Sequence, residues 1–146
     1  MTLVELIVAF TIMALLTTMA LPLARYKIRR EREKELHYAL REVRAAIDKY
    51  KDASDYRQIP PGKVDSDGYP ESLEQLVEGV RPQGSADKKV KFLRRIPKDP
   101  MTNSYEWGLR STRDEPASQS WGGQNVFDIY SKTTEKTSDG TPYSEW

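Results

Sequence analysis

The sequence predicts an α+β protein that begins with one long α-helix. Residues 1–24 are apolar apart from threonines and Glu5, and a helical spacing of apolar residues continues to about residue 54. Beyond this point, short alternating segments separated by glycine and proline are typical of β-strands and turns. We therefore expect an apolar helix half over 1–24, an amphipathic helix half over 25–54 and a globular part over 55–146.

Length and composition limit the possible functions. The chain has 146 residues, a formal net charge of +1 and no cysteine. This length suits a single domain, and the balanced charge gives no reason to expect a nucleic-acid partner. The sequence contains no glycine-rich phosphate loop, metal-ligand spacing or nucleophile elbow, and the lack of cysteine excludes disulfides. We expect no enzymatic activity.

Residues 1–24 have the length of a membrane span. At about 1.5 Å per residue, a helix of this length crosses a hydrocarbon core of roughly 30 Å, and the first basic residue is Arg25. A cleavable secretion signal is the alternative, but no basic segment precedes the apolar run, which is also long for such a signal. We expect a membrane helix.

Glu5 is the unusual residue of this segment, because an acidic side chain inside a membrane span is costly and usually has a partner. The nearest cation is the α-amino group of the chain, which a side chain at position 5 is poorly placed to reach within its own helix. Two interpretations stay open. Glu5 pairs with the amino terminus of a neighbouring identical helix and sets the stagger between subunits, or it lies among lipid headgroups.

The second helix half is predicted from one apolar stripe, which implies that either the chain's own sheet or a neighbouring helix packs against it. The stripe comprises Leu36, Leu40, Val43, Ile47 and Tyr50. Pro22 lacks a backbone N–H and is expected to kink or locally unwind the helix. The charges between Arg25 and Glu35 are interpreted as a solvated helix face, and His37 as a surface or interface residue.

The globular part is predicted to contain a short helix and three strands. Proline near its start and glycine at its end delimit a helix over about 70–79. Alternating or proline-bounded segments predict strands over about 90–96, 105–110 and 125–131, followed by a carboxy-terminal loop over 132–146. Core or interface packing accounts for Trp107, Trp121 and Tyr143 more simply than electron transport does.

Several parts of the chain carry a family resemblance. The run Met1-Thr2-Leu3-Val4-Glu5-Leu6 resembles the processed amino terminus of the type IV pilin superfamily, in which a leader is removed, the new first residue is N-methylated and position 5 is Glu. Met1 stands where that family usually has Phe. Pro22 falls where the family's first helix carries a proline. The segment around Pro97, Asp99 and Pro100 is similar to one in the major pseudopilins of type II secretion systems, although Met101 replaces the Trp of that pattern.

The resemblance implies a pilin-like fold, in which the apolar helix half projects and the second half packs on a small antiparallel sheet. It implies a structural subunit that polymerises into a helical filament and drives the export of folded proteins. Glu5 would then pair with the Met1 amine of a neighbour. The implied partners are further copies of the chain, minor pseudopilins, a prepilin peptidase and an inner-membrane assembly platform. The implied location is the inner membrane of a Gram-negative-type bacterium before assembly, and a periplasmic or cell-surface filament afterwards.

The resemblance also suggests a calcium site, because major pseudopilins have one in the loop after the last strand. The matching oxygen donors here are Asp128, Asp139 and Glu145, in a tail that ends in Trp146 like the family's but is shorter and has fewer acids. Asp139-Gly140 is also typical of a simple turn. No other cofactor is expected.

Two other functions stay open. The chain could be the major subunit of an extracellular type IV pilus-like filament, or a monomeric membrane-tethered binding module in which Glu5 lies among the headgroups. A monomer is expected to stay with the membrane after shearing, whereas a filament subunit is expected to be released in part.

Overall fold

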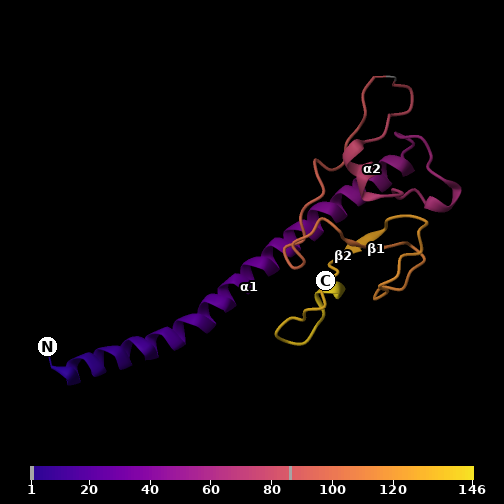
Figure 1. Cartoon of the computed structure of the whole chain (residues 1–146). Helices are drawn as coiled ribbons and strands as arrows, with labels where there is room; N and C mark the ends of the chain where they lie inside the picture. The colour runs from indigo at the N-terminus through magenta and orange to yellow at the C-terminus, as the bar shows by residue number, and fades with distance from the viewer. Residues whose placement is uncertain (1, 86) are drawn as a thin grey trace. The chain divides into compact units, whose positions relative to one another are not determined.

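The computed structural model describes residues 2–85 and 87–146 and has the predicted α+β class. Its elements, in which η denotes a 3₁₀ turn, follow in the order α1 (Leu3–Asp55), η1 (Val64–Ser66), α2 (Leu73–Glu78), β1 (Gly108–Arg110), β2 (Asp128–Tyr130) and η2 (Tyr143–Glu145) (Figure 1). The chain divides into two units, residues 1–35 and 36–146. We call them the amino-terminal unit and the head.

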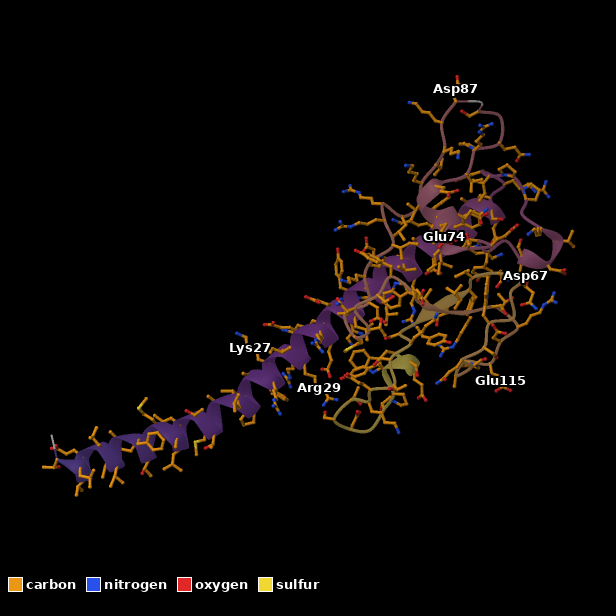
Figure 2. All side chains as sticks on the ribbon, in the orientation of Figure 1. Lys27, Arg29, Asp67, Glu74, Asp87 and Glu115 are labelled. Atoms are coloured by element: carbon orange, nitrogen blue, oxygen red, sulfur yellow. The ribbon has the colours of Figure 1, made fainter. Side chains whose placement is uncertain are left out.

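The described part of the amino-terminal unit is helical from Leu3 onwards and leaves its apolar side chains uncovered. The large hydrophobic residues from Leu3 to Leu23 are between 51% and 75% exposed. Figure 2 shows carbon-rich side chains leaving this stretch on every visible side of the ribbon. A helix that is apolar all round is stable only in apolar surroundings, such as a lipid bilayer or a bundle of similar helices.

Threonine hydroxyls in the apolar stretch form hydrogen bonds within the helix. The hydroxyls of Thr11 and Thr17 donate to the carbonyls one turn earlier, those of Ile7 and Met13, each at 2.7 Å. Helix α1 continues past Pro22 without a break, so the helix is not unwound there, and the kink expected at this residue stays a prediction. Proline is tolerated in apolar helices when the backbone groups that it leaves unbonded find other partners.

The core of the head is built on the carboxy-terminal half of α1. Its buried residues are Leu36, Ala39, Leu40, Val43, Ala46, Ile47, Tyr50 and Ala53. They share one core with residues of the following segments: Ile59, Leu73, Leu76, Leu93, Trp107, Val126, Ile129 and Tyr143. The stripe predicted from the sequence therefore packs against the chain's own head.

The sheet is small and antiparallel. β1 and β2 pair over three positions, Gly108 with Tyr130, Leu109 with Ile129 and Arg110 with Asp128. Gly108 is required at its position because a Cβ there would overlap the ring of Tyr130. Both strands are shorter than the predicted 105–110 and 125–131, since flanking backbone groups bond elsewhere: the N–H of Ser111 donates to Asp114 at 2.7 Å and that of Val126 to the carbonyl of Pro70 at 2.7 Å.

The strand predicted over about 90–96 is wrong. This segment makes only an isolated bridge between Val80 and Val90. The N–H groups of Phe92 and Leu93 both donate to the carbonyl of Leu76, at 3.0 Å each, so the end of α2 takes up the donors that a strand partner would need. Leu93 of this segment is buried in the core, whereas Val90 is 42% exposed, so its apolar residues contribute to packing without forming a strand.

The helix α2 lies inside the range of 70–79 expected from the sequence. Ser72 caps it by accepting a hydrogen bond from the N–H of Gln75 at 3.3 Å. Gly79 ends it with φ of 81°, where a side chain would also meet the backbone of Val90. These local signals fix both ends of α2 and present its buried residues Leu73 and Leu76 to the core.

Candidate functional site

Glu5 forms a capping box with Thr2 at the start of α1. The N–H of Thr2 donates to Glu5 Oε2 at 2.8 Å, and the N–H of Glu5 donates to Thr2 Oγ1 at 3.3 Å. The first N–H groups of any helix lack partners within the helix, and this reciprocal pair satisfies two of them. The Glu5 carboxylate therefore has a structural role at the exposed amino-terminal end of α1.

This arrangement adds a contact that the sequence interpretation did not include. Glu5 was expected to be poorly placed to reach the α-amino group of its own chain, and its carboxylate bonds to the backbone N–H of Thr2. The pattern Thr-x-x-Glu before an apolar run is a known sign of a capping box and predicts this contact directly. Met1, the other residue predicted to act in assembly, lies outside the described residues.

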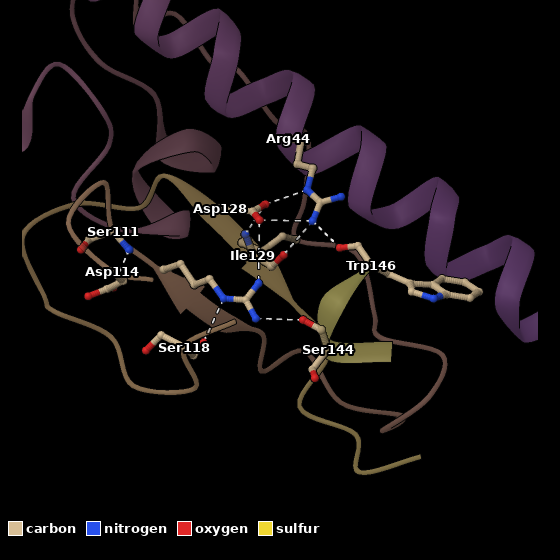
Figure 3. A network of polar contacts seen from close by, with 9 residues as sticks. Arg44, Ser111, Asp114, Ser118, Asp128, Ile129, Ser144 and Trp146 are labelled. Carbon is tan, nitrogen blue, oxygen red and sulfur yellow. Dashed lines mark hydrogen bonds and ion pairs between the residues drawn. The ribbon is translucent and has the colours of Figure 1, made fainter. Parts of the chain in front are cut away.

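A polar network ties α1 to the sheet and tail of the head (Figure 3). The Nε of Arg44 lies 2.6 Å from Asp128 Oδ1, and its Nη2 lies 3.3 Å from Asp128 Oδ2. The same Nη2 donates to the carbonyls of Ile129 at 3.3 Å and Trp146 at 2.6 Å. One helix side chain thereby holds β2 and the last residue of the tail.

Arg110 holds the other side of this network. Its side chain is only 5% exposed, and it lies 3.9 Å from Asp128 Oδ2. It donates to the carbonyls of Ser118 and Ser144, each at 2.9 Å, and its guanidinium lies 4.1 Å from the centre of the Tyr130 ring. A buried cation is stable only when its charge and its donors are satisfied, and these contacts supply both.

The tail is anchored by aromatic side chains. The rings of His37 and Trp146 are stacked with centroids 4.1 Å apart, and Tyr143 meets Trp146 edge-on at 4.9 Å. Tyr143 is fully buried and begins η2, in a region that the sequence predicted as a loop. Tyr143 is thus a packing residue of the head, whereas His37 is an exposed residue whose ring stacks on the tail.

The other two tryptophans donate hydrogen bonds to backbone carbonyls within the head. Trp107 is buried and its indole N–H donates to the carbonyl of Pro97 at 2.9 Å. Trp121 is 41% exposed and donates to the carbonyl of Asn125 at 2.8 Å, which closes the turn before β2. Asp99, between the two prolines of the family-like segment, is buried and accepts a hydrogen bond from Ser131 Oγ at 2.6 Å.

The structure does not bring the three calcium candidates together. Asp128 is engaged with Arg44, as described, and Glu145 lies exposed in η2. Asp139 accepts a hydrogen bond from the hydroxyl of Thr137 inside a tight turn, and this bond is the main cause that lowers its pKa below the usual value. Over residues 2–85 and 87–146, no group of three or more His, Asp or Glu side chains is arranged to hold a metal ion.

Asp114 organises the loop between the two strands. Its carboxylate accepts the N–H groups of Ser111 at 2.7 Å and Gly122 at 3.0 Å. Hydrogen bonds from these two backbone groups, first Ser111 and then Gly122, lower the pKa of Asp114. The loop is therefore closed by an ionised carboxylate.

In the described part of the chain, α1 is long and apolar enough to cross a membrane. This property indicates a membrane anchor or a signal sequence. Comparisons with known protein families, curated proteins and solved structures give no match. The long apolar amino-terminal helix and the small antiparallel sheet packed on its second half are consistent with a pilin-like fold.

Proposed function

We propose that this chain is a structural subunit that polymerises into a helical filament. The observation that carries the proposal is the uncovered apolar surface from Leu3 to Leu23, in the same helix that supplies the core of the head. Such a surface is stable in a bilayer before assembly, and packing against identical helices would cover it afterwards. Contacts between different surfaces of identical subunits, when they do not close into a ring, generate open helical polymers.

Glu5 is the residue proposed to set the register between subunits. Its carboxylate is exposed and accepts a single hydrogen bond among those described, from Thr2. An ionised carboxylate has room for several donors, so it can keep the Thr2 contact and also accept the amine of a neighbouring chain. Pairing these opposite charges in an apolar filament core would offset the cost of burying each of them.

The specific role that we propose is the major pseudopilin of a type II secretion system. Support comes from the resemblance of residues 1–6 and of the segment around Pro97, Asp99 and Pro100. The partners in this role are other copies of the chain, minor pseudopilins, a prepilin peptidase and an inner-membrane assembly platform. The filament would grow from the inner membrane into the periplasm and drive folded proteins outwards.

Two substitutions at Glu5 separate the assembly role from the capping role. Glu5→Gln keeps an oxygen that can accept the N–H of Thr2 but loses the charge, whereas Glu5→Ala loses both. If the charge pairs with a neighbouring amine, both variants lose filaments, as seen by electron microscopy of sheared material. Glu31→Gln, which neutralises an exposed acid farther along α1, is the matched control and should assemble normally. Normal filaments from Glu5→Gln would exclude the charge-pairing model.

Deleting the gene distinguishes the proposed role from the alternatives. Loss of secretion of folded proteins, without long surface filaments at native expression, is expected for a pseudopilin. Long sheared filaments that contain this chain, with secretion intact, would instead identify a pilus-like subunit. Complete retention in the membrane fraction, with secretion intact, would identify a tethered monomer and refute the filament proposal.

A further inference from the structure

Residues 25–30 form what we call the basic collar. It contains Arg25, Lys27, Arg29 and Arg30 and no acidic residue. We propose that the basic collar binds the headgroups of anionic phospholipids. The inference rests on the proposed function only in that it requires a subunit inserted in a membrane.

The position and length of the collar match a headgroup layer. It starts directly after the apolar stretch that ends at Leu23 and Ala24. At about 1.5 Å per residue it covers roughly 9 Å of helix, and each polar layer of a bilayer is roughly 5–8 Å thick. Long basic side chains extend this reach further. Charged nitrogens are therefore placed at the depth of the lipid phosphates.

The cations of the collar surround the helix. Arg25 and Arg29 are four residues apart and share one side, while Lys27 and Arg30 are three apart and share another. Figure 2 shows Lys27 and Arg29 leaving α1 on opposite sides. A protein partner would contact one side of the helix, whereas a headgroup layer surrounds it. The distribution therefore favours lipid over a docked protein.

The collar carries four basic residues and no acid in its own sequence, unlike the next turns. From Glu31 to Glu35, acids and bases alternate along the sequence, so their charges largely cancel. Within the collar, Arg29 Nε lies 3.5 Å from Glu33 Oε1, in a pair whose arginine is 41% exposed. An exposed pair of this kind is weak, and a lipid phosphate can join it. The excess positive charge is thus confined to the headgroup depth.

An aromatic side chain within the collar supports the same placement. Tyr26 is 53% exposed, and the guanidinium of Arg30 lies 4.9 Å from the centre of its ring. Tyrosine is enriched where membranes meet water, because its ring is apolar and its hydroxyl is polar. Tyr26 and Arg30, one helical turn apart, thus place an aromatic ring beside a guanidinium group that can bind a phosphate.

The test measures which lipids border the full-length chain in a bilayer. The chain is reconstituted in phosphatidylcholine vesicles that contain a trace of spin-labelled phosphatidylglycerol or spin-labelled phosphatidylcholine, and electron paramagnetic resonance gives the fraction of each at the protein boundary. Each basic residue near an anionic headgroup strengthens binding to it by about fivefold. We expect phosphatidylglycerol to be enriched about threefold or more at about 0.05 M NaCl, and this enrichment to fall at about 0.5 M NaCl.

Matched variants assign the effect to the collar. Lys27→Gln/Arg30→Gln removes two cations, keeps the Arg29–Glu33 pair and retains good helix formers. It should lower the enrichment by at least half. Lys88→Gln/Lys89→Gln removes two exposed cations from a loop of the head and should leave the enrichment unchanged.

The outcomes separate this inference from the proposed function. Equal boundary fractions of the two lipids, or equal loss in both double variants, would overturn the collar proposal even if the chain inserts normally. Failure of the wild type to co-float with vesicles of either lipid would contradict the membrane-inserted state, and with it the proposed function. Enrichment that is lost only in the collar variant would support the inference.

Discussion

Replacing Asp128 by asparagine should strongly destabilise the head. The substitution keeps the shape and one acceptor oxygen but removes the charge that Arg44 contacts at 2.6 Å and Arg110 at 3.9 Å. A hydrogen bond to a charged group contributes about 1.5–3 kcal/mol, and breaking a fully buried ion pair costs about 3–5 kcal/mol. Asp128 is 25% exposed, which reduces the latter value. We expect a loss of about 2–4 kcal/mol in the free energy of unfolding.

Urea unfolding of the full chain in mild detergent measures this loss. The fluorescence of Trp107, which is 4% exposed, should change as the head opens. With a urea dependence of about 2 kcal/mol per M, the midpoint should fall by about 1–2 M. Lys63→Gln is the matched control, because its ion pair with Glu71 joins a lysine that is 77% exposed. Removing this pair should cost no more than about 0.5 kcal/mol.

A double-mutant cycle tests the physical reason for the loss. If Asp128 acts through Arg44, then Arg44→Met combined with Asp128→Asn should be less destabilising than the sum of the two single changes. A midpoint for Asp128→Asn equal to that of Lys63→Gln would refute the reasoning. Strict additivity in the cycle would also refute it.

Three further predictions concern the sheet, the tail and the loop between the strands. Gly108→Ala should lower the urea midpoint by more than any surface change, because its new methyl group overlaps the ring of Tyr130; an unchanged midpoint would contradict this packing. Trp146→Ala should remove the stack on His37 and shift the histidine ring signals in the NMR spectrum, whereas unshifted signals would exclude the contact. The pKa of Asp114 is lowered by folding, so its carboxylate stabilises the head above the unfolded value of 3.8 and loses this effect as the pH falls through the folded value. Asp114→Asn should therefore lose less stability than the wild type between about pH 5 and pH 2, and an equal loss would refute the linkage.

The helices were predictable because their signals are local. The apolar run from Leu3 has the length of a membrane-spanning helix, the stripe from Leu36 repeats with the period of a helix, and the structure places both in α1. Ser72 and Gly79 are sequence signals for the ends of a short helix, and α2 ends within one residue of each. The contact between Thr2 and Glu5 was equally predictable from its spacing.

The rest of the fold and of the candidate site depends on contacts that no local sequence pattern encodes. Arg44 and Asp128 are 84 positions apart, and nothing in the neighbourhood of either residue indicates the other. The segment 90–96 has the composition of a strand, but its donors bond to the end of α2. The ion pair between Asp128 and Arg44 was unpredictable for the same reason, and the calcium role raised for Asp128 by the family resemblance stays a prediction.

The contact between Arg44 and Trp146 has a consequence for the order of folding. These residues are 102 positions apart, and the bond between them can form only when the tail has been synthesised. Contacts at such separations slow folding, because a long loop must close before they form. Helix α1 can therefore be in place early, while the head completes its fold only after residues 143–146 have been added to the chain.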